Sequence, residues 1–549
     1  MLNCREEVLQ LTKQLVGVAS VVGTPGEPVL AHWIYGYLAQ LPYFQRNPGH
    51  LRLQRTESDD RERYNVIALV KGEKKPSAQT VLMLGHLDTV GTEDFGVLQP
   101  FAHSHDELVD HLEEWDLNPE EIADLRSGRW LLGRGALDMK AGLASQIYII
   151  KAMAAQAEEL EGNLALLAEC DEEDMSHGVL SALPLLATIA EDHGLEYQAA
   201  INADYTSPRY PGDDGRYLYL GTVGKLLPAF YVTGKETHVG QPFEGLDPNL
   251  IVAELTRRLS YNPDLCDVAY GETTLPPVSL KQADFKDVYT VQTPLAAHAY
   301  FNFFIHSWSP AKVLELMREQ AHQAFADTLA QLNERHRSYC ELAHAPYHPL
   351  PWLPRVLTYE ELYQELANHH GQQFTEAMEE KARELIMNEV DLRDFCTALV
   401  EEGWRWSTNR EPAIIVYYGS VYYPRIEITG QNQAEERLLE AVNSALSQVK
   451  LDPAHPIRLR KFYPYISDVS FLSVSDDPAA IEAYTANFPA WGIKHYVDFN
   501  LISQLNLPVV NIGPYGFDAH KRLERLDIDY SCQVVPNLIL STVERLLNG

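Results

Sequence analysis

The sequence predicts an α/β protein in which a mostly parallel, mixed sheet is flanked by helices and a smaller α+β domain is inserted. Three observations support this prediction. The first 220 residues alternate short apolar runs with helical patterns, as parallel strands joined by helices do. This alternation is lost near Gly221 and returns from Pro412. At 549 residues the chain is also too long for one ordinary hydrophobic core.

The predicted sheet of the main domain rests on short apolar runs that end in polar residues. A helical pattern over residues 4–18 precedes these runs, and a second one from Met139 to about Ala155 divides them. The runs predicted as strands are NVIALV (65–70), VLMLGHLD (81–88), NLALLAEC (163–170), QAAINAD (198–204) and, much later, VVNIG (509–513).

The domain boundaries follow the changes of pattern. Residues 1–222 are expected to form the first part of the main domain, 223–337 the inserted α+β domain, and 338–549 the second part of the main domain. The region of about 338–411 is broken by prolines and then strongly helical. We therefore expect it to be a helical insertion in the second part.

Composition narrows the classes of partner and the cellular location. Lys plus Arg number 44 against 77 for Asp plus Glu, a net charge of −33, which disfavours nucleic acid and anionic membranes as partners. No run of about 18 apolar residues predicts a membrane span, and the N-terminus lacks a secretory signal pattern. Six scattered cysteines without a CxxC motif are typical of reduced thiols. These features together predict a cytoplasmic protein.

Residues that carry chemistry gather where predicted strands end. In open α/β sheets, sites form outside the carboxyl ends of the strands, so such residues are expected to converge. Asp138 lies at a predicted helix start after a Gly-rich turn, and His520 follows a late strand and a Gly/Pro turn. The residues that close or follow strands are His86, Asp88, Glu172, Glu173 and Asp204.

This set of side chains suits a centre of two divalent ions. Imidazoles mixed with carboxylates suit zinc, and also cobalt or manganese, and one carboxylate can bridge two ions. Glu172 is available to accept a proton from the attacking water, while Asp88 can hold the second nitrogen of His86. Each motif also has a simpler interpretation, such as a solvated acidic turn or, for Asp138, a helix cap. Their shared position at strand-to-helix junctions favours the metal site.

Six motifs in a fixed order resemble a known family. They are GHLDTV (85–90), LLGRGALDMKAGLAS (131–145), AECDEED (168–174), INAD (201–204), THVGQP (237–242) and GPYGFDAHKRLERLD (513–527). The chain resembles the co-catalytic zinc amidohydrolases and aminopeptidases, which include acetylornithine deacetylase, succinyl-diaminopimelate desuccinylase, aminoacylase and carboxypeptidase G. The length and the wording of two motifs look most like the arginine-utilisation, RocB-type branch.

The resemblance implies a role for each of these residues. It implies that Asp138 bridges two ions, with Glu172 as general acid/base and Asp88 orienting His86. It also implies that 223–337 is a lid that forms a homodimer, and that His238 helps to polarise the substrate carbonyl. From the residues alone, His238 is a strand-end histidine. The remaining implied ligands are His86 and Asp204 on one ion, and Glu173 and His520 on the other.

Three departures from the family pattern leave the metal ligands untouched. They are the added acidic segment, Asn302 in the lid strand, and the helical block of about 338–411, which has no counterpart in the shorter members. Asn302 stands where many relatives have an Asp-x-Arg pattern, while Ser467 and Asp468 are retained in YPYISDVSF (463–471). Asp468 and the tyrosines around it suggest a pocket for an arginine-related group. The acidic segment of about 103–125 holds three histidines, which could form another metal site, although a solvated helical excursion is favoured.

The sequence therefore predicts a two-metal hydrolase that cleaves an amide bond. The expected substrate is a small N-acyl amino acid, dipeptide or arginine-related amide, and the expected cofactors are two divalent ions, zinc first. The alternative is a non-catalytic small-molecule binding or regulatory protein on the same fold. Loss of Glu172 or of a metal ligand would indicate that alternative, and none is lost.

Overall fold

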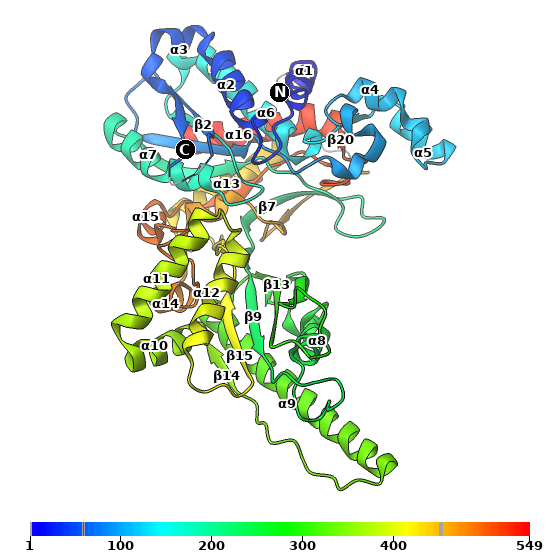
Figure 1. Cartoon of the computed structure of the whole chain (residues 1–549). Coiled ribbons are helices and arrows are strands. Elements are labelled where there is room, and N and C mark those ends of the chain that lie inside the picture. Colours follow the sequence, from blue (N-terminus) through cyan, green and yellow to red (C-terminus); the bar gives the residue numbers. More distant parts are fainter. Residues whose placement is uncertain (1–2, 58, 60, 450–453, 549) are drawn as a thin grey trace. The chain divides into compact units, whose positions relative to one another are not determined.

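The computed structural model describes residues 3–57, 59, 61–449 and 454–548, which divide into two compact units (Figure 1). Unit 1 takes the described residues within Met1–Thr222, Ile426–Val474 and Asp498–Gly549. Unit 2 takes Val223–Arg425 and Ser475–Val497. Each unit has its own sheet, and the two are described separately.

The boundary at residues 222 and 223 falls where the sequence pattern changes, but the helical block differs from expectation. Residues 338–425 group with unit 2, together with 475–497, rather than with the main domain. The reason is strand pairing at either end of the block. Ala413–Tyr418 pairs along six residues with Pro228–Thr233 of unit 2, and Val356–Thr358 pairs beside it. A helical pattern in the sequence does not show which sheet the strands on either side of it will join.

Unit 1 is built on a large mixed sheet, as predicted. Within the described residues the sheet has nine strands, in the order β1-β2-β5-β3-β6-β18-β7-β16, with β17 also paired to β7. The strands are β1 (Leu51–Arg55), β2 (Tyr64–Lys71), β3 (Gln79–His86), β5 (Asn163–Glu169), β6 (Glu196–Asn202), β7 (Arg216–Thr222), β16 (Ile426–Glu427), β17 (Ile457–Arg460) and β18 (Val509–Asn511).

The centre of this sheet is parallel and deeply buried. β3 pairs in parallel with β5 and β6, and β6 pairs in parallel with β18. β1 runs antiparallel to β2, β2 to β5, and β7 to β18, which makes the sheet mixed. Every residue of β5 is buried, because a parallel strand covered on both faces can be apolar throughout. The carboxyl ends of β3, β5, β6 and β18 therefore lie at one edge.

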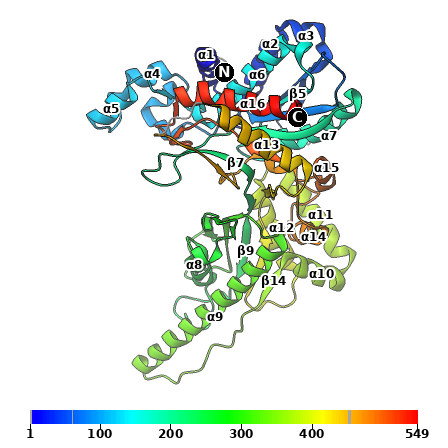
Figure 2. The same ribbon diagram turned by 180° about the vertical axis from the view of Figure 1, so that it is seen from behind.

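Helices cover both faces of the sheet of unit 1. α2 lies above the strands and α7 below them in both views (Figures 1 and 2). α6 packs on β3 and β5, and α16 packs on α6 and α13. The helices are α1 (Arg5–Val16), α2 (Gly26–Ala39), α3 (Pro42–Arg46), α4 (His105–Asp110), α5 (Pro119–Leu125), α6 (Ala141–Ala155), α7 (His177–His193), α13 (Gln433–Gln448), α15 (Phe499–Leu505) and α16 (Val535–Asn548).

A smaller three-stranded sheet accompanies the main sheet. It contains β4 (Trp130–Leu132), β19 (Gly516–Phe517) and β20 (Arg525–Asp527). The acidic segment of about 103–125 folds into α4 and α5, whose apolar residues pack with Trp130 and Leu132 in a separate small core. The predicted helical excursion therefore has its own packing, and His105 accepts a hydrogen bond from the main chain of Leu132.

Unit 2 is a second α+β body. Its main sheet has the order β12-β13-β9-β15-β14, with β8 paired to β13, and α8 and α9 pack against it. The strands are β8 (Gly224–Leu226), β9 (Pro228–Thr233), β10 (Val268–Ala269), β11 (Glu272–Thr273), β12 (Val278–Asp284), β13 (Ala296–Ile305), β14 (Val356–Thr358) and β15 (Ala413–Tyr418). The helices are α8 (Pro248–Leu259), α9 (Pro310–Ala343), α10 (Tyr359–His370), α11 (Gln372–Met387), α12 (Leu392–Trp406) and α14 (Pro478–Ala486).

Two chain-wide features bear on the sequence predictions. Over the described residues, no helix combines the length and the apolar character that crossing a membrane requires. All six cysteines are free thiols, and five of them are buried. The predicted fold class, a mostly parallel mixed sheet flanked by helices with a separate sheet domain, is confirmed.

Candidate metal centre

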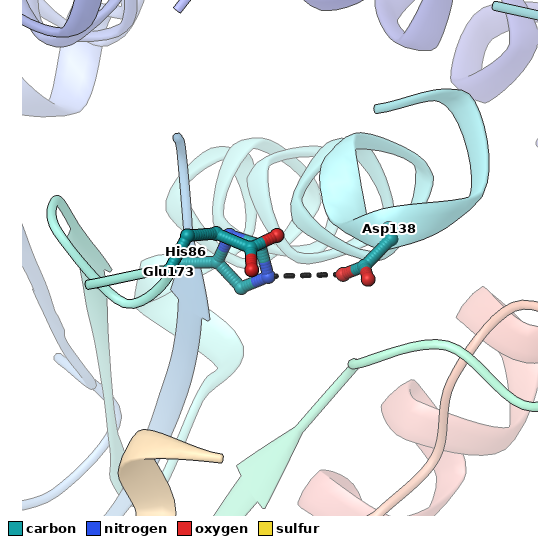
Figure 3. A group of neighbouring side chains, drawn as sticks. All are labelled: His86, Asp138 and Glu173. Atoms are coloured by element: carbon teal, nitrogen blue, oxygen red, sulfur yellow. Dashed lines mark hydrogen bonds and ion pairs between the residues drawn. The ribbon is translucent and has the colours of Figure 1, made fainter. Parts of the chain in front are cut away.

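His86 is the last residue of β3 and is buried at the carboxyl edge of the sheet. Its Nδ1 lies 3.0 Å from the main-chain carbonyl oxygen of Asp88, an atom that can only accept a hydrogen bond. Nδ1 therefore carries a proton. Burial opposes a charged imidazole, but the hydrogen bond between Nε2 and Asp138 and the nearby carboxylates outweigh it and raise the pKa of His86 well above its ordinary value. That Nε2 lies 3.1 Å from Oδ1 of Asp138 (Figure 3). His86 thus presents a metal-binding nitrogen toward a carboxylate.

Asp138 lies between two histidines. Its Oδ1 faces Nε2 of His86, and its Oδ2 lies 2.9 Å from Nε2 of His520. Each carboxylate oxygen therefore has an imidazole of its own. A carboxylate that bridges two metal ions uses its two oxygens in this same way. The arrangement is compatible with the bridging role that the family resemblance implies for Asp138.

Glu173 completes the centre from the loop after β5. Its Oε1 lies 3.0 Å from Nε2 of His520. One ligand atom each of His86, Asp138 and Glu173 lies within 4.8 Å of the others, as one ion requires (Figure 3). These three residues are 35 to 87 positions apart in the sequence, and the sheet brings them together.

Asp204 lies just beyond β6 and is held from the neighbouring strand. Its main-chain N–H donates to Oδ1 of Asn511 at 2.9 Å, and Nδ2 of Asn511 donates back to its carbonyl at 2.8 Å. Burial, and after it the negative charge of nearby Asp138, raise the pKa of Asp204 to about 8. Asp204 is therefore close enough to the centre for the charge of Asp138 to raise its pKa.

Asp88 holds the loop that carries the two glutamates. Its two carboxylate oxygens accept the main-chain N–H groups of Glu172 and Glu173, at 3.3 and 3.1 Å. The same carboxylate lies 3.8 Å from Nδ1 of His86, too far for a hydrogen bond. The sequence predicts that the Asp88 side chain orients His86. In the structure, the main-chain carbonyl of Asp88 contacts the imidazole, and the side chain contacts the loop.

A buried ion network supports the same loop from the other side. Asp171, at φ 67°, lies in the left-handed region and pairs with Arg63 at 2.9 Å and with Nδ1 of His177 at 2.6 Å. Arg63 also pairs with Glu27 and Asp59, both at 3.1 Å. The conformation of residues 171–173 is therefore fixed by side chains from α2, α7 and the loop before β2.

Glu524 positions the main chain at Asp138. Its Oε1 accepts the N–H groups of Leu137 and Asp138, at 3.1 and 3.2 Å, and its Oε2 accepts from Arg134 at 2.8 Å. Glu524 directly precedes β20 and follows the turn that carries His520. One buried carboxylate thus connects the segments that carry two members of the centre.

The charges of the centre fit bound cations. Among the described residues, no lysine or arginine forms an ion pair with Asp138, Glu172, Glu173 or Asp204, and the ion pairs of Asp138 and Glu173 are with histidines. Burial opposes a charged imidazole, but hydrogen bonds to Asp138 and Glu173 outweigh it and raise the pKa of His520 to about 11. Buried carboxylates without basic partners are costly unless cations neutralise them. The donor set and its charge both suit divalent ions.

Glu172 lies in the same loop, directly before Glu173. Burial raises the pKa of its carboxyl well above the ordinary value, and the charges of Glu173 and Asp468 add to this. Asp468 itself is fully buried, and burial also raises its pKa. Ser467 is held at the end of β6, because its Oγ accepts from Nδ2 of Asn202 at 2.8 Å.

His238 and Asn302 belong to unit 2, whereas the metal centre belongs to unit 1. His238 is exposed, and its Nδ1 accepts the N–H of Gly240 at 3.0 Å. Asn302 lies on β13, opposite Val278 of β12. Their expected contacts with substrate therefore remain predictions.

Several supporting residues are not singled out by the sequence prediction. The pattern AECDEED could have pointed to Asp171, and GRGALDMK to Arg134, because charged residues beside strand ends need partners when buried. Glu169 ends β5 opposite His86, and neither of its buried oxygens has a hydrogen-bond partner among the described residues. No local sequence pattern indicates the roles of Glu524 and Asn511.

Comparison with known proteins places the chain in a family. A model described as Peptidase family M20/M25/M40 matches residues 82–530. Protein RocB of Bacillus subtilis (strain 168) is 34% identical over 550 residues, covering 100% of this chain and 96% of that protein. Uncharacterized protein YqjN of the same strain is 35% identical over 551 residues, covering 99% and 97%.

A solved structure agrees with the fold. Aminopeptidase PepT from Bacillus cereus ATCC 10987 aligns with a TM-score of 0.51 at 11% identity, covering 99% of this chain and 98% of that one. At this identity the likeness concerns the fold alone. The family and the branch predicted from the six motifs are confirmed by the full-length matches. The chain belongs to Peptidase family M20/M25/M40, whose members are typically metal-dependent hydrolases.

Proposed function

We propose that this protein hydrolyses an amide bond of a small N-acyl amino acid, a dipeptide or an arginine-related amide. The observation that carries the proposal is the position of Asp138, with one carboxylate oxygen at His86 and the other at His520. Such an arrangement suits two ions held side by side. Membership of a hydrolase family and the intact Glu172 support catalysis over simple binding.

Two divalent ions, zinc first, would be held by five side chains of unit 1. His86 and Asp204 would take one ion and Glu173 and His520 the other, with Asp138 shared between them. When bound, such ions polarise the amide carbonyl and make water a stronger acid near neutral pH. The carbonyl of Asp88 holds Nδ1 of His86, so His86 would bind an ion through Nε2, which faces Asp138, once Nε2 gives up its proton.

Glu172 is the residue that moves the proton in this proposal. Its carboxylate accepts a proton from the attacking water and returns it to the leaving nitrogen. Asp88 keeps this glutamate in place through the main-chain N–H groups of residues 172 and 173. His238 of unit 2 would donate a hydrogen bond to the oxygen that gains negative charge.

We assign substrate recognition to Asn302, which differs from the family pattern, and to Ser467 and Asp468, which are retained from it. Asn302 and Ser467 would contact the polar part of the substrate. Asp468 is fully buried, so it would act on a basic substrate group through Ser467 rather than by direct contact. We also propose a homodimer formed through unit 2 and a location in the cytoplasm.

The test combines metal content with turnover. Metal per chain is measured by elemental analysis for the wild type, His86→Ala and Glu172→Gln, alongside release of free amine from N-acyl and dipeptidyl arginine, ornithine and neutral amino acids. About two ions are expected in the wild type, fewer in His86→Ala, and a full load without turnover in Glu172→Gln. Glu158→Gln, an exposed acid on the same unit, is the matched control.

Three results would reject parts of the proposal. Full turnover in Glu172→Gln would remove the assigned acid/base role. A wild type that binds no divalent ion and cannot be reconstituted would remove the two-metal mechanism and favour the binding-protein alternative. Equal turnover of neutral and arginine-derived amides would reject the arginine preference alone.

A further inference from the structure

Unit 1 holds a second cavity outside the metal centre. Its volume is about 500 Å³, and none of the metal-centre residues lines it. It is formed where α1, β7, β17 and β20 begin or end, and three of these elements are labelled in Figure 1. The charged groups that line it are Arg5, Arg129, Arg216, His455, Asp527 and Asp529.

The cavity is lined by more arginines than acidic residues. Oδ2 of Asp527 is shared by Nη2 of Arg129 at 2.9 Å and Nη2 of Arg216 at 3.4 Å. Asp529 pairs with Arg5 at 2.6 Å. Three guanidinium groups thus face two carboxylates, which leaves a positive excess in a chain whose net charge is −33. A local positive pocket in an acidic protein concentrates anions.

Arg216 offers a buried donor that has no acceptor. It is 3% exposed, and its Nε has no hydrogen-bond partner among the described residues. The guanidinium is fixed in place, because it stacks 3.4 Å above the ring of Tyr515 and Nη1 donates to the carbonyl of Asp214. An unpaired buried donor costs free energy, and most buried donors in proteins are satisfied. Arg216 is therefore set up to receive an acceptor atom.

Tyr530 supplies a second such donor in the same cavity. It is 9% exposed, and within the described part of the chain its hydroxyl has no partner. Burial raises the pKa of this hydroxyl, so it stays protonated and able to donate. Its main-chain N–H donates to Oδ1 of Asp527 at 3.2 Å, which ties the tyrosine to the arginine cluster. Two residues that line the cavity thus each carry a buried donor without an acceptor among the described residues.

Two apolar side chains, Ile457 and Val534, also line the cavity, beside Gln533. Ile457 is the strand neighbour of Arg216 in the register between β17 and β7, and Val534 lies one turn beyond Tyr530. Small-molecule sites typically combine such apolar walls with a few fixed polar groups, at volumes of a few hundred cubic ångströms. The cavity thus has room for a small organic molecule as well as for its charged group.

We propose that this cavity binds a small organic anion, whose carboxylate or phosphate group accepts from Arg129, Arg216 and Tyr530 and whose apolar part lies against Ile457 and Val534. Guanidinium groups bind both oxyanions through paired N–H groups, so the shared chemistry is that of a planar or tetrahedral oxyanion. The site does not depend on the proposed hydrolysis, because it shares no residue with the metal centre.

Calorimetric titration of the full-length protein with succinate and, separately, with inorganic phosphate at constant ionic strength tests the site. Tyr530→Phe removes one unpaired hydroxyl and leaves the ring in place. Arg129→Gln removes one guanidinium that is already half exposed, with 45% of its side chain accessible. Arg126→Gln is the matched control, because Arg126 is 39% exposed, pairs with Glu113 and does not line the cavity.

The expected result is saturable binding of at least one probe by the wild type. Affinity should fall about tenfold in Arg129→Gln and several-fold in Tyr530→Phe, and should be unchanged in Arg126→Gln. Without a probe, Tyr530→Phe should melt no lower than the wild type, because the hydroxyl it removes has no partner among the described residues. Binding of succinate alone identifies a carboxylate site, and binding of phosphate alone a phosphate site.

Three results would overturn the proposal. They are no binding of either probe, an equal loss in Arg126→Gln, and binding that is abolished in His86→Ala but kept in both cavity variants. The last would mean that the metal centre, not the cavity, holds the anion.

Discussion

The main-chain N–H of Glu173 donates to a carboxylate oxygen of Asp88 at 3.1 Å, which ties the loop after β5 to the end of β3. Asp88→Asn keeps the shape of this side chain but offers one acceptor in place of two. We expect a loss of about 10- to 100-fold in metal affinity or kcat, as is usual when a residue that supports a metal ligand is changed. Metal titration and steady-state kinetics measure both quantities.

The control for this variant is Asp106→Asn. Asp106 is an exposed acid that pairs with Lys13 at 3.4 Å, so its change should leave both quantities within experimental error. Wild-type metal affinity and kcat in Asp88→Asn would show that the 172–173 loop holds its conformation without this carboxylate.

Gly513 is required because Asp204 approaches it closely. A Cβ built on Gly513 would lie 1.6 Å from the carbonyl oxygen of Asp204, which is main chain and cannot swing away. Gly513→Ala should therefore push the ends of β6 and β18 apart and lower the free energy of unfolding by about 1–3 kcal/mol. It should also weaken metal binding, because Asp204 moves with its main chain. Chemical denaturation and metal titration test the two effects.

Gly36→Ala provides the comparison within the same unit. Gly36 lies in α2, and a Cβ there meets nothing within 4 Å. Alanine favours helix, so this variant should be as stable as the wild type or more stable by up to about 1 kcal/mol. Equal stability of both glycine variants would contradict the steric argument for Gly513.

The strands that carry the centre can be predicted because they are buried toward their carboxyl ends. The runs that form β3, β5, β6 and β18 are apolar and end abruptly in polar residues, and the end of a parallel strand is where sites form. This reasoning places His86 and Asp204 at one edge of the sheet from the sequence alone. Strand β7 is not predicted from the sequence, because its alternating tyrosines lie at the change of pattern near Gly221.

The residues that support the centre cannot be predicted in the same way. Glu524 contacts the main chain of Asp138 across 386 positions, and Asn511 contacts Asp204 across 307. A local pattern contains no information about such partners. The grouping of residues 338–425 differs from expectation for a related reason, since β14 and β15 join the sheet of unit 2 through pairing that no helical pattern reveals.

Arg63 should be among the most sensitive residues for stability in unit 1. Its side chain is 3% exposed and pairs with three carboxylates, those of Glu27, Asp59 and Asp171. Arg63→Met leaves these acids buried without their cation, and we expect a loss of about 3–5 kcal/mol in the free energy of unfolding. Arg52→Met changes a surface arginine 4.0 Å from Asp192 and should cost less than about 1 kcal/mol. Similar losses in the two variants would contradict a structural role for the network.

Metal affinity should rise with pH through the neutral range. In the metal-free protein, burial and Asp138 hold the pKa of Asp204 at about 8, and the pKa of His520 is about 11. The pKa of His86 is also raised well above its ordinary value, so all three groups hold a proton at neutral pH, and a metal ion must displace these protons to bind. Lowering the pH below about 8 therefore adds competition from the proton of Asp204 to that from the two histidines.

Calorimetric titration with zinc or manganese in buffers of different ionisation enthalpy counts the displaced protons. The wild type should release close to three protons per loaded centre near neutral pH, and the logarithm of the affinity should climb with a slope of up to about three per pH unit. Asp204→Asn has no proton to give up at that position. This variant should therefore release about one proton fewer per loaded centre, and its affinity should rise less steeply with pH. An affinity that stays constant between about pH 6 and pH 8 would mean that none of these groups gives up a proton to the metal, and the roles of His86, Asp204 and His520 would have to be reassigned.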